Sequence, residues 1–229
     1  MKITANFFEK IFKISAPQFA KFKKLHEIFS AENEKINLSA IRNSREIWEK
    51  HFFDSLLISQ FLRNENCSKI LDIGTGGGFP LLPNAIIFEN KNFAAIESRE
   101  KKIKIVQKFC SKLKIENCEF LNSRAEILAH EKNFRENFDA VFARAFAPLP
   151  IFIEVGAAFL RKNKFLIAFC GGDFDEKIFK FAQNFSLKKF KILRKNLPNG
   201  DPRTILIFQK LQNLPRKFPR IWVKIKSEI

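Results

Sequence analysis

The sequence predicts an α/β protein built on a doubly wound, mostly parallel sheet, and three observations support this fold class. From about Ser68 onward, short apolar runs alternate with segments of helical periodicity, as in successive βαβ units. The first of these runs ends in a glycine-rich turn, Gly74–Gly78. The last two runs are separated by Asn199-Gly200, which favours a tight antiparallel hairpin because both residues tolerate positive φ.

The segment ahead of the sheet, residues 1–66, predicts a helical extension that leans on the main domain. Ser44, followed by Glu46 and Ile47, is the expected N-cap of a helix there. Apolar side chains recur at helical spacing in two stretches, Phe22, Leu25 and Phe29, then Trp48, Phe52 and Leu56.

The main domain is expected over residues 67–210. Its parallel strands are expected at Lys69–Ile73, Phe93–Glu97, Glu119–Asn122, Phe138–Ala143 and Phe165–Phe169. Helices are expected near residues 80–90, 100–114, 149–161 and 173–185. In the second helix one apolar stripe runs among lysines: Ile103, Val106, Phe109 and Leu113.

Two further strands, Lys188–Asn196 and Thr204–Lys210, complete a predicted seven-stranded sheet with a terminal antiparallel hairpin. A terminal hairpin is expected of Rossmann-like methyltransferases, whereas dinucleotide-binding Rossmann domains continue in parallel. The remaining residues, 211–229, form a basic C-terminal tail whose role the sequence leaves open.

Composition narrows the class of protein and its partners. Lys and Arg number 41 against 24 Asp and Glu, giving a formal net charge of +17. Such an excess attracts polyanions, although a composition rich in Lys, Asn, Ile and Phe could produce it without a functional cause. Aromatic contact surfaces must come from the 29 Phe and 2 Trp, because Tyr is absent.

The sequence also predicts a cytoplasmic protein that binds neither membrane nor metal. No apolar run reaches the roughly 18 residues of a membrane span, and the start MKITANFFEK lacks the features of a secretory signal. The four cysteines are scattered without metal-ligand spacing, which favours reduced thiols. Nothing in the sequence demands more than a monomer.

The loop Asp72-Ile73-Gly74-Thr75-Gly76-Gly77-Gly78-Phe79-Pro80 follows a buried strand, and its glycines let a cofactor approach backbone amides. Glu97, at the end of the next strand, can accept hydrogen bonds from both ribose hydroxyls of a nucleoside cofactor. An Asp two residues before the first glycine favours S-adenosylmethionine over a dinucleotide. The segment after the third strand, Asn122–Glu126, would lie near the adenine ring, and Arg144 could meet a carboxylate or phosphate.

No catalytic base is evident from the sequence. His26, His51 and His130 have no triad-like neighbours, and no Cys follows the fourth strand to attack a pyrimidine ring. Methyl transfer to an atom with a free lone pair, such as guanine N7, needs mainly alignment and exclusion of water.

With these motifs together, the sequence resembles the bacterial 16S ribosomal RNA guanine-N7 methyltransferases, the RsmG or GidB family, from about residue 25 to 210. The resemblance rests on Asn33–Ala40, Lys50–Leu56, Asp72–Pro80, Ser123–Glu126 and Ala143–Ala147. This chain departs from the family at Leu81, where a glycine is usual, and at Cys170, where a lysine is frequent.

The resemblance implies methylation of N7 of one guanine in 16S rRNA, with the small ribosomal subunit as partner. It implies a cofactor site lined by Gly74, Phe79, Ala125, Glu126 and Arg144, with Glu97 at the family's acidic position. Lys50, His51 and Arg203 would face the RNA. Two alternatives remain open: methylation of a small molecule or protein, and a relative that binds RNA without catalysis.

Overall fold

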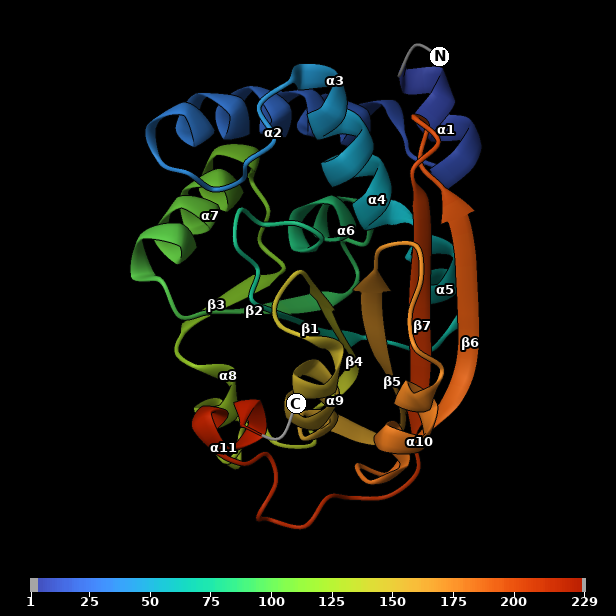
Figure 1. Ribbon diagram of the computed structural model, residues 1–229. Coiled ribbons are helices and arrows are strands. Elements are labelled where there is room, and N and C mark those ends of the chain that lie inside the picture. Colours follow the sequence, from blue (N-terminus) through green and yellow to red (C-terminus); the bar gives the residue numbers. More distant parts are fainter. Residues whose placement is uncertain (1–3, 228–229) are drawn as a thin grey trace.

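The fold is a single seven-stranded sheet between two layers of helices, seen in a computed structural model that describes residues 4–227 (Figure 1). Residues 1–3 and 228–229, parts of the expected extension and tail, lie outside the described residues. The strands are β1 Lys69–Ile73, β2 Asn92–Glu97, β3 Cys118–Asn122, β4 Phe138–Arg144, β5 Leu160–Cys170, β6 Leu187–Asn196 and β7 Pro202–Lys210.

The strand order is β3-β2-β1-β4-β5-β7-β6. The pairings among β1 to β5 are parallel, whereas β7 runs antiparallel to both β5 and β6. The predicted doubly wound sheet with a terminal antiparallel hairpin is therefore confirmed. The chain reverses its direction across the sheet between β1 and β4, where ligands bind in folds of this class.

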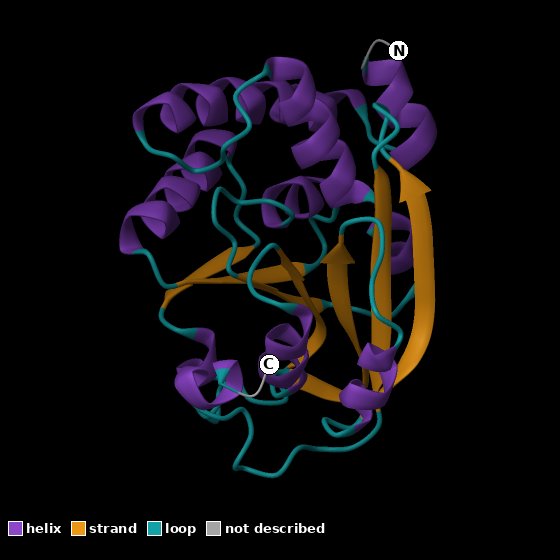
Figure 2. Cartoon of the chain, viewed as in Figure 1, coloured by secondary structure: helices purple, strands orange, loops and turns teal. Residues whose placement is uncertain are grey.

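Helices cover both faces of the sheet (Figure 2). Side chains alternate between the two cores along each central strand, as Ile70 and Leu71 do on β1 and as Phe142 and Val141 do on β4. The helical elements are α1 Ala5–Phe12, α2 Ala16–Lys35, α3 Ser44–Ile47, the π-helix η1 Trp48–Phe53, α4 Asp54–Leu56, α5 Ser59–Asn64, α6 Leu81–Ile87, α7 Glu100–Leu113, α8 Ala125–Leu128, α9 Leu149–Ala157, α10 Lys177–Gln183 and α11 Trp222–Lys226.

The N-terminal helices pack on the same core as α6 and α7. Helix α2 begins with a capping box, in which the Ser15 side chain and the Gln18 side chain each bond the other's backbone amide. Phe22, Leu25 and Phe29 are completely buried, as their helical spacing predicts. Figure 1 shows α2 lying across the top of the molecule, above α6 and α7.

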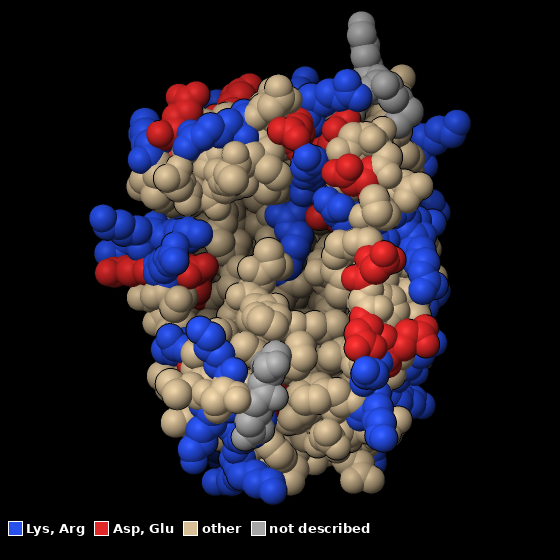
Figure 3. Space-filling model, in the orientation of Figure 1, with Lys and Arg blue, Asp and Glu red and all other residues tan. Residues whose placement is uncertain are grey.

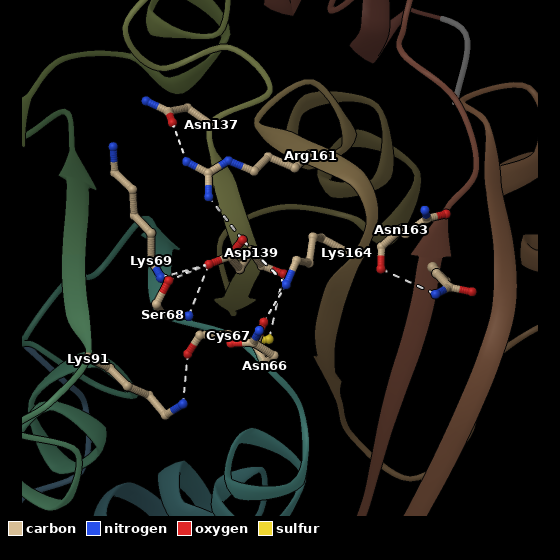
Figure 4. A network of polar contacts seen from close by, with 11 residues as sticks. Asn66, Cys67, Ser68, Lys69, Lys91, Asn137, Asp139, Arg161, Asn163 and Lys164 are labelled. Atoms are coloured by element: carbon tan, nitrogen blue, oxygen red, sulfur yellow. Dashed lines mark hydrogen bonds and ion pairs between the residues drawn. The ribbon is translucent and has the colours of Figure 1, made fainter.

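Asp139, at the start of β4, holds the amino ends of three neighbouring strands together (Figure 4). Its Oδ2 accepts hydrogen bonds from the Ser68 amide and hydroxyl and from the Lys69 amide, at 2.9–3.0 Å. Its Oδ1 pairs with Arg161 at 3.1 Å and with Lys164 at 3.5 Å, both on β5. This network lies at the opposite edge of the sheet from the glycine-rich loop.

Three local predictions were wrong. Asn43, not Ser44, caps α3, because its side chain accepts the amides of Arg45 and Glu46. The predicted helix 149–161 ends at Ala157, and β5 already begins at Leu160, which pairs with Phe138 across a bulge. The β6–β7 turn has positive φ at Gly200 alone, so Asn199-Gly200 is not the two-residue turn that was expected.

Candidate functional site

A cavity of about 520 Å³ opens at the carboxyl ends of the parallel strands. Small-molecule sites usually occupy roughly 300–1,000 Å³. The face shown in Figure 3 is hollowed near its centre, and Lys and Arg side chains gather in and around the hollow. The cavity wall combines the glycine-rich loop, the ends of β2 and β4, the start of α8, and single residues from α2, η1 and α11.

The glycine-rich loop is folded back against β2. The amides of Gly74 and Thr75 both donate to the Ile96 carbonyl, at 2.8 and 3.2 Å. Gly74 has a φ of +74°, and a Cβ there would lie 2.7 Å from the Phe146 ring. Both the backbone conformation and the neighbouring ring therefore require glycine at this position.

The Glu97 carboxylate links the loop to the start of α7. Its Oε2 accepts the Gly76 amide at 3.1 Å, and its Oε1 accepts the Arg99 amide at 2.9 Å. The side chain lines the cavity and is held in place by these bonds. Each carboxylate oxygen can accept a second hydrogen bond, so Glu97 retains acceptor capacity for a ligand.

Asp72 is completely buried, and neither of its carboxylate oxygens has a hydrogen-bond partner. Burial raises its pKa to about 7, although the nearby Thr75 hydroxyl, the Arg144 charge and the Leu81 amide favour the charged form. Thr75 lines the cavity, and its buried hydroxyl is also unpartnered. Unsatisfied buried polar groups are costly, so a ligand or an ordered water that reaches Thr75 would satisfy one of them.

Arg144, the last residue of β4, joins the sheet to the N-terminal helices. Its guanidinium donates to the Lys50 carbonyl at 2.7 Å, to Asp54 at 3.1 Å and to His51 Nδ1 at 3.0 Å. Asp54 also pairs with Arg203 on β7 at 3.3 Å. The carboxylate that Arg144 meets therefore belongs to the protein itself.

His51 is neutral and fixed in one tautomer. Arginine can only donate, so Nδ1 accepts from Arg144 and the ring proton resides on Nε2, which donates to the Ser39 hydroxyl at 2.9 Å. Burial, reinforced by the Arg144 charge, lowers the His51 pKa to about 3, against a smaller opposing effect of a Lys50 backbone contact. The ring also stacks on Phe79, with centroids 4.9 Å apart.

At the start of α8, Ala125 and Glu126 reach the cavity while remaining largely buried. The Glu126 carboxylate accepts from the Arg124 side chain at 2.5 Å. Arg124 is itself half exposed and also lines the cavity. This side of the cavity therefore combines a buried backbone segment with a paired charge.

The six residues expected to hold a cofactor all line this one cavity: Gly74, Phe79, Glu97, Ala125, Glu126 and Arg144. Of the residues expected to face RNA, His51 lines the cavity wall but is only 7% exposed. Lys50 and Arg203 do not line the cavity, and they pair with Glu46 and with Asp54 respectively. Their binding roles remain predictions.

Sequence reasoning missed three residues of this region. Asp54 lies in the segment that carried the resemblance, yet no local signal shows that it pairs with arginines about 90 and 150 positions away along the chain. Phe146 follows β4 and packs over Gly74. Trp222, from the basic tail, also lines the cavity, and nothing in the sequence places it there.

Within residues 4–227, His, Cys, Asp and Glu side chains form no group that could hold a metal ion. In the same range, no helix has the length and apolar character needed to cross a membrane.

The profile of the rRNA small subunit methyltransferase G family matches residues 18–203 of this chain. The chain is 36% identical over 213 residues to the ribosomal RNA small subunit methyltransferase G of Streptococcus suis, covering 91% of this chain and 90% of that protein. It is 37% identical over 212 residues to the Lactococcus lactis protein of the same name, covering 91% and 89%.

Solved structures share the fold at lower sequence identity. An O-methyltransferase from Bacillus cereus, solved in complex with SAH, superposes with a TM-score of 0.59 at 16% identity, covering 90% of this chain and 96% of that one. A SAM-dependent methyltransferase from Aquifex aeolicus superposes with a TM-score of 0.57 at 14% identity, covering 80% and 98%. These likenesses concern the fold.

Proposed function

This chain belongs to the rRNA small subunit methyltransferase G family, and on that premise we propose that it transfers a methyl group from S-adenosylmethionine to N7 of one guanine in 16S rRNA. The observation that carries the proposal is the cavity at the carboxyl ends of the strands, where the glycine-rich loop and the Glu97 carboxylate lie together. The reaction would take place in the cytoplasm, on the small ribosomal subunit or its RNA.

The residues present fit a cofactor that joins a nucleoside to an amino acid. Glu97 has acceptor capacity for two ribose hydroxyls and is held toward the cavity by the Gly76 and Arg99 amides. The buried Thr75 hydroxyl, in a residue that lines the cavity, has no hydrogen-bond partner, and a polar group of the ligand or an ordered water would satisfy it. The fit therefore rests on an orphaned buried hydroxyl as well as on the loop pattern.

In this proposal Gly74 and Phe79 shape the wall, while Ala125 and Glu126 hold the nucleobase end. Arg144 positions the wall by tying β4 to Lys50, His51 and Asp54. When bound, S-adenosylmethionine supplies an electrophilic methyl group on a positively charged sulfur. The protein's contribution is alignment of that group with the incoming base and exclusion of water.

The state of His51 favours an acceptor that needs no deprotonation. The Nδ1 lone pair is occupied by Arg144, and the low pKa keeps the ring neutral at physiological pH. Guanine N7 carries a free lone pair and can accept a methyl group without a base. An exocyclic amine would have to lose a proton, and His51 is poorly placed to take it.

The charge of the chain favours RNA over a small neutral substrate. The formal net charge is +17, and Lys and Arg side chains lie in and above the hollow on the face shown in Figure 3. A positively charged rim concentrates polyanions near a cleft. We propose that Lys50, His51 and Arg203 lie on the side of the cavity from which the RNA approaches.

The test is transfer of radiolabelled methyl from S-adenosylmethionine to small ribosomal subunits, to naked 16S rRNA and to total cytoplasmic protein. The proposal expects label in RNA, with a rate that falls steeply between 50 and 200 mM salt, because phosphate contacts are screened (roughly tenfold or more for several contacts). Label in protein, or RNA labelling that does not respond to salt, would contradict it.

A further inference from the structure

The C-terminal segment after β7 is held against the rest of the protein by hydrogen bonds. The Arg135 guanidinium donates to the Leu214 carbonyl and to the Phe218 carbonyl, both at 2.8 Å. The Leu214 amide donates to Glu136 at 2.8 Å, and Leu214 is itself buried. The first half of the segment is therefore fixed against the loop between α8 and β4.

A buried carboxylate fixes the second half. Glu154 on α9 is completely buried, and its oxygens accept from the Arg220 amide at 2.7 Å and from the Arg220 guanidinium at 2.8 Å. The His130 ring bonds the Pro219 carbonyl at 2.8 Å. Ile225, within α11, is 1% exposed. Because Glu154 accepts hydrogen bonds from both the amide and the guanidinium of Arg220, it fixes the position of the backbone that leads into α11.

These anchors bring Trp222 to the cavity. The indole lines the cavity wall and is half-buried. It meets the Phe146 ring edge to face at 5.8 Å, and the Arg124 guanidinium lies 5.3 Å from its ring centroid. Figure 1 shows α11 next to α8. Trp222 therefore spans the gap between the loop that follows β3 and the loop that follows β4.

The position of the indole matches the nucleobase end of the proposed ligand. Arg124 immediately precedes Ala125 and Glu126, whereas the unsatisfied polar groups, Asp72 and Thr75, belong to the glycine-rich loop. An indole face suits stacking on a planar base. The remaining large ring beside it, Phe146, already packs over Gly74.

We propose that Trp222 is a cofactor-contacting residue, whose indole packs against the adenine ring of S-adenosylmethionine and closes that end of the cavity. The inference rests on the proposed function, because it assumes that this cofactor occupies the cavity. It assigns the C-terminal segment a role in the site: Glu154 and Arg135 position the backbone that carries Trp222.

The chain allows a direct optical test, since Trp48 and Trp222 are its two tryptophans. Trp48 stacks on Phe19 and on His26 in the N-terminal helices, at 5.6 and 5.3 Å. In Trp48→Phe, indole fluorescence therefore reports Trp222 alone. Titration of this variant with S-adenosylhomocysteine should change the fluorescence and saturate at the Kd that calorimetry gives for the unaltered protein.

Affinity variants supply the second arm. Trp222→Ala should weaken S-adenosylhomocysteine binding by about five- to tenfold, the lower part of the range for base–aromatic stacking, because the ring is partly open to solvent. Trp222→Phe should restore most of the loss. The neighbour Val223 is 73% exposed on the same short helix, and Val223→Ala should leave the Kd unchanged.

The outcomes separate this inference from the proposed function. If the unaltered protein binds S-adenosylhomocysteine but Trp222 fluorescence stays constant and Trp222→Ala binds equally well, the inference is overturned and the proposed function stands. If Trp222→Ala raises only the KM for RNA, the indole contacts the substrate and the inference is likewise overturned. If the unaltered protein does not bind the ligand, both fail. Should Trp222→Ala not fold, the fluorescence arm decides alone.

Discussion

At the residue scale, two buried titratable groups, Asp72 and His51, have pKa values displaced by burial in opposite directions. Burial raises the pKa of Asp72 to about 7 and lowers that of His51 to about 3. Each shift favours the neutral form. Hydrogen bonds with Arg144 and Ser39 satisfy both ring nitrogens of neutral His51, whereas neither oxygen of Asp72 has a hydrogen-bond partner. Asp72 is therefore the group to test for a contribution to ligand binding.

The raised pKa of Asp72 predicts a free energy of unfolding that declines as the pH rises. Between about pH 4 and pH 7 the unfolded chain has lost the Asp72 proton while the folded protein retains it, so folding becomes less favourable as the pH increases. Asp72→Asn removes this titration. Denaturant unfolding at pH 5 and pH 8 should show a smaller decline in the variant, by about 1–3 kcal/mol, and binding of S-adenosylhomocysteine should be at least about tenfold weaker. Unchanged binding would remove Asp72 from the site.

Substitution of Asp54 is expected to lower the free energy of unfolding. It is 4% exposed and balances both Arg144 and Arg203. Asp54→Ala should lower the free energy of unfolding by about 3–5 kcal/mol, because two partly buried arginines lose their counter-charge. Arg203→Ala is the matched control and should cost less, since Arg144 keeps Asp54 as its partner. Equal losses, measured by urea denaturation, would show that Arg144 does not depend on Asp54.

At the scale of elements, local patterns predicted the strands because burial on two faces produces short apolar runs, as at Ile70–Ile73 and Val141–Ala143. They also predicted that the glycine-rich loop and Glu97 meet at one edge of the sheet, because loops that follow parallel strands lie together there. The cofactor-site set Gly74, Phe79, Ala125, Glu126 and Arg144 came from the family resemblance. Local patterns could not predict the π-helix at Trp48–Phe53 or the course of the C-terminal segment. Those depend on contacts such as Arg144 with Lys50 and Arg220 with Glu154, between residues distant in sequence.

The Asp139 network is expected to contribute to the free energy of unfolding by joining the amino ends of β1, β4 and β5. Despite an opposing effect of burial, the amides of Lys69 and Ser68, the Ser68 hydroxyl and the Lys164 charge lower the Asp139 pKa to about 2. Its stabilising contribution is therefore present above about pH 4 and is lost as the pH falls toward 2. Asp139→Asn should cost about 1–3 kcal/mol at pH 7.

The same substitution should cost much less at pH 2.5, where the native Asp139 is partly protonated as well. This pH dependence is opposite in sign to that expected of Asp72. Because the network lies at the far edge of the sheet, S-adenosylhomocysteine should bind Asp139→Asn as tightly as the unaltered protein. Weaker binding measured by calorimetry would show that the two edges of the sheet are coupled.

At the scale of the whole molecule, the architecture gathers segments from across the chain around one cavity: α2, the π-helix, the carboxyl ends of β1 to β4 with the loops that follow them, and the C-terminal segment. The N-terminal helices share a core with α6 and α7, so their positions and the shape of the cavity are linked. The charge of +17 gives the whole surface an affinity for polyanions. Recognition of one guanine among many must come from the shape and contacts of the cavity and its surroundings.

Methylation of guanine N7 in 16S rRNA is tested most directly by mapping the methylated base. Small ribosomal subunits that lack endogenous N7 methylation are incubated with the protein and radiolabelled S-adenosylmethionine, and the 16S rRNA is then cleaved chemically at N7-methylated guanines. We expect one new cleavage site carrying the label. Label without N7-specific cleavage, or no label although S-adenosylhomocysteine binds, would contradict this expectation.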